Sequence, residues 1–181
     1  MTIEAELNKI NPDIYMELFD FDATELTDSF GNPGIVYYFT NTPTGGGSSP
    51  ILWKGNNYYP FPFELQGVDY RGDGTAPNRP IITLSNANKF LLAAVLSLGS
   101  LVGMTITRWR TFYKYTDNGS EANPLMTLPA EEWTVARRVP NPQSVLQFEL
   151  SSPLDRPGAT LPAKQILRDF GFPGVSRVRS R

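Results

Sequence analysis

The chain has 181 residues, a hydrophobic content of 40% and a formal net charge of −2, which suits one domain with a sizeable core. It contains neither cysteine nor histidine, which excludes disulfides, thiolate metal sites and catalysis by the commonest general base. Its 15 glycines and 16 prolines favour many turns and short strands over a helical bundle.

Charge is distributed unevenly along the chain. Residues 1–69 contain ten acidic and two basic residues, whereas residues 70–181 contain eight acidic and fourteen basic ones. Two halves of opposite sign suit docking against other copies or charged neighbours, and ordinary solvated faces would give the same pattern. The N-terminus lacks the basic start and apolar core of a signal peptide. The most apolar segment, residues 90–104, is too short to span a membrane.

The N-terminal third predicts one short helix and two strands. Thr2 can cap a helix that continues to about Lys9. A strand is expected from Asp13 to Phe21, and its apolar residues fall on both faces, so one face is expected to be covered and the other to contact a partner. Residues 35–40 form the strongest short strand by β-branched and aromatic content.

A hairpin is expected next, with strands Ile51 to Trp53 and Tyr58 to Pro60 joined by turn residues Lys54 to Asn57. The glycine-rich loop at residues 41–50 is not followed by Lys-Ser/Thr or by the start of a helix. We therefore interpret it as a mobile hairpin tip, because a phosphate-binding loop requires both features.

The middle of the chain predicts further strands around one long helix. An alternating run covers residues 63–70, a short strand covers residues 81–84, and a long exposed loop lies between them at residues 71–80. The helix is expected from about Ala87 to Leu98, where a wide apolar stripe indicates burial, and Gly99 can end it in the left-handed conformation.

A strand from Gly103 to Phe112 follows the helix. Alternation places Arg108 and Arg110 on one face and Trp109 on the other. Arginines interleaved with aromatics can bind single-stranded nucleic acid. The chain is not basic overall and has no known nucleic-acid module around the pair, so direct nucleic-acid recognition is the weaker reading.

The C-terminal third predicts a second hairpin, from residues 132–139 and 144–150, after a polar loop at residues 116–129. A short element is expected at residues 164–170. We expect one β-rich domain over residues 1–168. Residues 169–181 form a basic tail, expected to be disordered unless a partner orders it.

These elements predict a mainly-β (α+β) fold, either two packed sheets or a distorted barrel, with one helix against a flank. The helix stripe and the strand patterns predict the following core residues: Phe90, Leu91, Val95, Ile106, Val36 and Phe148.

Two functional alternatives come from the residues alone. A carbohydrate-binding module is possible if four aromatics, Trp53, Tyr58, Tyr59 and Phe61, form an exposed stacking platform, although such rings more often belong to a core or an interface. A carboxylate-based glycosidase would need a pair such as Glu131 and Glu132, which point to opposite faces if they lie in a strand. The other candidate pair, Asp20 and Asp22, can share a face but lies in an acidic run expected to be a solvated loop.

Several segments, read in order, resemble the minor tail protein L family of long-tailed phages similar to lambda. The resemblance covers roughly residues 1–168, and its force lies in the order of the segments rather than in one diagnostic motif. The matching segments are Trp53 to Pro62, Arg79 to Asn86, Leu101 to Phe112, Trp133 to Arg137, Phe148 to Asp155, and Leu161 to Ile166.

The resemblance implies a structural, non-enzymatic role in the virion, at the distal end of the tail, for a protein made in the host cytoplasm. Similar proteins are hub subunits between a ring at the end of the tail tube and the central receptor-binding protein. A homotrimer is therefore expected, and genome DNA is expected to pass through the ring without specific binding. The resemblance implies no catalytic residue in this chain.

The family pattern differs from this chain in one respect. Members similar to the lambda protein continue into a cysteine-rich extension that holds an iron–sulfur cluster. Residues 167–181 contain no cysteine, so either this member lacks the cluster or the given sequence stops short of it. In both cases we expect no cofactor in these 181 residues.

Overall fold

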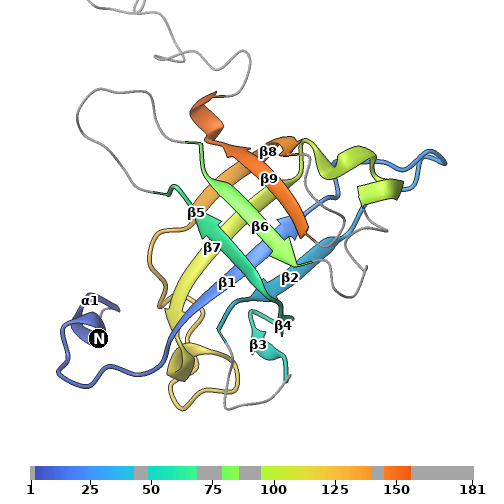
Figure 1. The fold of residues 1–181 in the computed structure, drawn as a ribbon. Helices are drawn as coiled ribbons and strands as arrows, with labels where there is room; N and C mark the ends of the chain where they lie inside the picture. Colours follow the sequence, from blue (N-terminus) through green and yellow to red (C-terminus); the bar gives the residue numbers. More distant parts are fainter. Residues whose placement is uncertain (1–2, 43–48, 69–78, 86–94, 140–144, 156–181) are drawn as a thin grey trace, which may run out of the picture.

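A computed structural model describes residues 3–42, 49–68, 79–85, 95–139 and 145–155. These residues form one nine-stranded sheet with the order β3-β4-β2-β1-β7-β8-β9-β6-β5 (Figure 1). The strands are β1 (Tyr15–Asp22), β2 (Val36–Thr40), β3 (Ile51–Trp53), β4 (Asn56–Pro60), β5 (Phe63–Gln66), β6 (Ile81–Ser85), β7 (Thr105–Phe112), β8 (Glu131–Val139) and β9 (Val145–Ser151).

Neighbouring strands are antiparallel except β2 and β4, which run parallel. The mainly-β prediction is therefore confirmed. The short helical elements of the described residues are the α-helix α1 (Ile3–Leu7) and the 3-10 turns η1 (Gly99–Leu101), η2 (Tyr113–Tyr115) and η3 (Pro153–Asp155).

The sheet folds back on itself. Figure 1 shows β5 and β6 crossing over β1 and β7. Phe63 of β5 packs edge-on against Phe19 and Phe21 of β1, with ring centroids 4.7 and 6.2 Å apart. The last strand in the sheet order thus covers the inner face of a central strand, which gives the large core its second wall.

That inner core contains three of the predicted core residues, Val95, Ile106 and Phe148, each at most 3% exposed. Val36 is half-buried, and Phe90 and Leu91 lie outside the described residues. A second, smaller core lies on the opposite face of the sheet and consists of Met16, Leu18, Ile51, Trp53 and Tyr58.

Strand β1 is covered on both faces by its own chain. Phe19 and Phe21 enter the inner core, while Met16 and Leu18 enter the second core under the β3–β4 hairpin. The expectation that one face of this strand contacts a partner is therefore wrong. The hairpin supplies the cover because its aromatic side chains fold over the outer face of the sheet.

The turn of the β3–β4 hairpin is shorter than predicted. Lys54 and Gly55 both have positive φ, 51° and 76°, which suits a two-residue turn between antiparallel strands. Asn56 and Asn57 pair with Trp53 and Leu52 instead of forming the turn.

Only the end of the predicted long helix is described. Residues 95–97 are helical, and Gly99 has the expected left-handed φ of 67°. Most of that helix, most of loops 41–50 and 71–80, the element at 164–170 and the basic tail lie outside the described residues.

The polar loop at residues 116–129, before β8, is held to the rest of the chain by backbone hydrogen bonds. Its backbone donates hydrogen bonds from Glu121 to the Lys114 carbonyl and from Leu128 to the Arg110 carbonyl, both 2.9 Å long.

Helix α1 is attached through charge. Glu6 is its buried residue, 2% exposed, and its carboxylate lies 2.6 Å from the ammonium groups of both Lys114 and Lys9. Leu7 and Ile10 are exposed. The apolar side of this N-terminal segment therefore faces solvent rather than the sheet.

Candidate functional site

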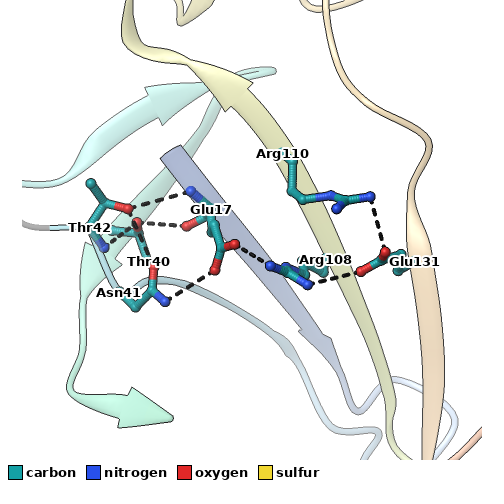
Figure 2. A network of polar contacts seen from close by, with 7 residues as sticks. All are labelled: Glu17, Thr40, Asn41, Thr42, Arg108, Arg110 and Glu131. Atoms are coloured by element: carbon teal, nitrogen blue, oxygen red, sulfur yellow. Dashed lines mark hydrogen bonds and ion pairs between the residues drawn. The ribbon is translucent and has the colours of Figure 1, made fainter. Parts of the chain in front are cut away.

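Two arginines and two glutamates form a compact network on the inner face of the sheet (Figure 2). Arg108 of β7 contacts Glu17 of β1 and lies 3.1 Å from Glu131 of β8. Arg110 donates to the other oxygen of Glu131 at 3.0 Å. The antiparallel register explains the contact, because Arg108 is directly opposite Glu131 and Arg110 is directly opposite Glu17.

The end of β2 and the two residues after it fix Glu17 from the other side (Figure 2). The Thr40 hydroxyl donates to the Glu17 carbonyl at 2.8 Å, and the Glu17 amide donates to the Thr42 hydroxyl at 3.4 Å. The Asn41 amide donates to the Glu17 carboxylate at 3.2 Å. Glu17 is therefore held by its backbone and its side chain together.

The charges of this network cancel, since each carboxylate faces a guanidinium. The arginine and glutamate side chains are 13–25% exposed, and arginine does not release its proton at physiological pH. The predicted shared face of Arg108 and Arg110 is confirmed, but their guanidinium groups contact carboxylates of the same chain. The network therefore joins three strands, and it leaves neither arginine free for phosphate.

A second polar cluster lies on the opposite face of the sheet, beside the smaller core. The carboxylate of Asp20 accepts hydrogen bonds from the Tyr58 hydroxyl at 2.7 Å and from the Trp109 indole N–H at 2.8 Å. The Lys54 ammonium lies 3.8 Å from the ring centroid of Trp109 and 4.2 Å from that of Trp53. Asp20 thus connects β1 to β4 and β7.

Burial dominates the electrostatics of this cluster. It raises the pKa of Asp20, although the hydrogen bonds from Tyr58 and Trp109 act in the opposite direction. Burial and the nearby Asp20 charge raise the pKa of the Tyr58 hydroxyl well above its usual range. Burial also lowers the pKa of Lys54. Tyr58 therefore remains a hydrogen-bond donor, and the cluster is suited to cross-linking the hairpin to the sheet.

The aromatic platform expected for carbohydrate binding is not formed. Trp53 and Tyr58 are 0% and 1% exposed, because they fill the second core. Phe61 packs on Phe39 with ring centroids 4.9 Å apart. Of the four residues, Tyr59 is the exposed one, with 54% of its surface accessible to solvent. One accessible ring does not make a stacking surface.

Neither candidate carboxylate pair forms an acid–base site. Glu131 faces inward into the arginine network, whereas Glu132 is exposed, as the strand alternation predicted. Asp20 and Asp22 lie within β1 rather than in the expected solvated loop. Asp20 accepts hydrogen bonds from Tyr58 and Trp109, and Asp22 accepts them from the amide and hydroxyl of Thr24. Among the described residues, no group of three or more acidic side chains lies close enough together to hold a metal ion.

Comparison with known proteins decides the family. The model of the phage minor tail protein L family matches residues 29–172, about four-fifths of the chain. The chain belongs to the phage minor tail protein L family. It is also 29% identical over 156 residues to tail tip protein L of Escherichia phage lambda, covering 83% of this chain. It spans 63% of the length of that relative.

The family match coincides with most of the sheet. Residues 29–172 include every strand from β2 to β9, and they exclude β1 and α1. In this member of the minor tail protein L family, β1 lies between β2 and β7 and supplies Glu17 and Asp20 to the two polar clusters. Family membership establishes a structural protein of the phage tail. Within the described parts of the chain, every helix is too short to cross a bilayer.

Proposed function

We propose that this chain is a structural subunit at the distal end of the phage tail, where it forms a hub ring between the tail tube and the central receptor-binding protein. The observation that carries the proposal is the match of the minor tail protein L family over residues 29–172. The lambda relative, a tail tip protein by name, supports the same position.

The ring is proposed to be a homotrimer that contacts the neighbouring ring protein and the central tail protein. The acidic excess of residues 1–69 and the basic excess of residues 70–181 support contacts between copies. Genome DNA would pass through the centre without specific binding, and an acidic or neutral lining would favour that passage because it does not attract phosphate.

The subunit is proposed to act without catalysis and without a cofactor. Glu17, Glu131 and Asp20 are engaged in structural contacts rather than facing a substrate pocket. The sequence contains no cysteine, so these 181 residues cannot supply thiolates to an iron–sulfur cluster. We propose that the chain is made in the host cytoplasm and assembled there into the virion.

Deletion of the gene, with complementation from a plasmid, tests this function. We expect particles made without the protein to have tails with incomplete tips and to lose infectivity, and complementation to restore both. Electron microscopy of the tails and mass spectrometry of purified virions provide the readouts. Normal tails on infectious particles without the protein would contradict the proposal.

A further inference from the structure

Strand β2 has a partly open edge. Its register with β4 covers Phe39 and Thr40, opposite Tyr59 and Pro60, whereas its register with β1 covers all of Val36 to Thr40. Within the described residues, Val36 and Tyr38 of β2 therefore have a paired strand on their β1 side only. Such an edge presents backbone groups that can pair with another strand.

An apolar groove of about 330 Å³ follows this open edge. Four consecutive residues of β2 line it from one side, and alternate residues of β4 and of the position just after it line it from the other. The lining residues are Val36, Tyr37, Tyr38, Phe39, Asn57, Tyr59 and Phe61. The groove thus lies beside the part of β2 that precedes its short parallel pairing with β4.

The open edge lacks the usual protection against strand addition. Proteins guard edge strands with lysine, proline or a β-bulge, but β2 has the sequence Val-Tyr-Tyr-Phe-Thr and pairs with β1 in uninterrupted register. Ile35 before the strand is 59% exposed, and Tyr59 beside the groove is 54% exposed. This apolar edge is therefore suited to pairing with a further strand.

The chain around the groove is acidic. Residues 10–53 contain six acidic residues and no lysine or arginine, and Arg108 from β7 pairs with one of the six, Glu17. Asp22 lies directly opposite Val36 at the open end of β2, and Glu25 is exposed in the loop that follows β1. Lys54, the next cation along the chain, is held over the Trp53 and Trp109 rings. A segment that covers the groove should therefore be basic as well as partly apolar.

We propose that residues 174–181 of a neighbouring copy occupy this groove and add a short strand to the edge of β2. Their sequence is Gly-Val-Ser-Arg-Val-Arg-Ser-Arg. In an extended strand, Arg177, Arg179 and Arg181 fall on one face and Val178 on the other. Val178 suits the aromatic groove and the arginines suit the acidic flank. This inference rests on the proposed ring, because the ring supplies the neighbour.

Chain length permits the exchange. Asp155 ends the last described element, and the 18 residues between it and Gly174 can span up to about 60 Å when extended. Donation of one segment to the next copy is a head-to-tail contact, which closes into a ring when the rotation between copies allows it. Backbone pairing would supply affinity, and the arginines would supply specificity.

Sedimentation velocity of the full chain tests the inference through a charge exchange. Tyr59→Lys places a cation at the groove, and its exposed position leaves the core intact. A second variant changes Arg177, Arg179 and Arg181 to Glu, and a third combines both changes. Leu125→Lys, at a residue 86% exposed in the loop before β8, is the matched control.

We expect the wild-type chain and the Leu125→Lys control to self-associate equally. Tyr59→Lys and the Arg→Glu variant should each weaken association about tenfold or more, since a tenfold change corresponds to about 1.4 kcal/mol. The combined variant should regain part of the loss, because its charges are again complementary. Hydrogen exchange at Val36 and Tyr38 should slow on association of the wild-type chain.

Three results would overturn the inference: a wild-type chain that stays monomeric, a groove variant that associates normally, or a combined variant with no recovery. A monomer whose β2 amides are protected from hydrogen exchange, with that protection lost in the Arg→Glu variant, would show instead that residues 174–181 of the same chain occupy the groove. Incorporation of Tyr59→Lys into virions is measured separately. Normal incorporation with unchanged association would reject this inference and leave the proposed function intact.

Discussion

At the scale of single residues, Asp20 is the shared hydrogen-bond acceptor of the second polar cluster, which lies beside the smaller core. Its pKa is raised by burial above the ordinary value of about 3.9. A raised folded pKa means that protonation of Asp20 favours the folded chain. The resulting stabilisation is fully present below the unfolded pKa and is lost as the pH rises through the folded pKa.

Asp20→Asn removes this titration while keeping hydrogen bonds, because its amide can accept from Trp109 and donate to the Tyr58 oxygen. The free energy of unfolding of the wild type, relative to that of Asp20→Asn, should fall as the pH rises from below about 3.9 to neutrality. Urea unfolding across that range measures the difference, and a difference independent of pH would contradict the assignment. Asp20→Ala should cost about 2 kcal/mol at neutral pH, because it leaves the buried Tyr58 hydroxyl and the half-buried Trp109 indole without an acceptor.

Arg108 gives a second residue-scale prediction. Arg108→Met leaves the carboxylates of Glu17 and Glu131 without their shared cation, and we expect a loss of about 3 kcal/mol in the free energy of unfolding. Arg137→Met is the matched control, since Arg137 pairs with Glu149 but has a side chain 70% exposed. Its cost should stay below about 1 kcal/mol. Equal losses in urea unfolding would show that the inner network does not stabilise the fold.

The sequence predicts side-chain direction better than it predicts partners. Alternation along one strand placed Arg108 and Arg110 together and Trp109 opposite them. Their carboxylate partners come from β1 and β8, which are distant in sequence, so local pattern gave no sign of the pairing. An inward-facing charge on an otherwise apolar strand face was the available signal that a buried counter-charge must exist.

At the scale of elements, α1 depends on one carboxylate. Hydrogen bonds from Lys114 and then Lys9 lower the pKa of Glu6 to about 2. A lowered pKa contributes stability above the unfolded value of about 4.3, and this stability is lost as the pH falls toward about 2.

Helix α1 should therefore detach in acid before the sheet unfolds, and Glu6→Gln should detach it at neutral pH. Hydrogen exchange of residues 3–14 measures both effects, with β7 as the internal reference. Unchanged protection of α1 in Glu6→Gln would show that apolar contacts hold the helix instead. Glu4→Gln is the matched control, because Glu4 is exposed.

The loop between β1 and β2 contains a close backbone approach. A Cβ added at Gly34 would lie 2.9 Å from the Cβ of Ala23 and closer still to its carbonyl oxygen. Gly34→Ala should cost about 2 kcal/mol, because the backbone must shift to relieve the overlap. Gly31→Ala has open space but a φ of 84°, so it should cost about 1 kcal/mol. Thermal unfolding of both variants tests the order, and the reverse order would contradict this account of the loop.

Element types were more predictable than element contacts. The strands at residues 35–40, 51–53 and 103–112 follow from local alternation and β-propensity. The buried position of Trp53 does not follow from them, because an aromatic hairpin has the same local sequence pattern whether its rings face solvent or pack on Met16 and Leu18. Tertiary packing decided that outcome.

At the scale of the whole molecule, the order of strands is the least predictable feature. Strand β1 lies between β2 and β7, and β6 pairs with β9. These non-local pairings depend on how faces match across the sheet, and a single sequence does not contain that information in its periodicity. The mainly-β class, in contrast, followed from composition and turn frequency.

Immunogold labelling of intact phage and isolated tails tests the proposed position at the tail tip most directly. Antibody against this chain should label the end of the tail distal to the head, and the Leu125→Lys variant should label in the same place. Label along the whole tail tube, label at the head, or no label on intact or mildly denatured particles would contradict a tail-tip ring.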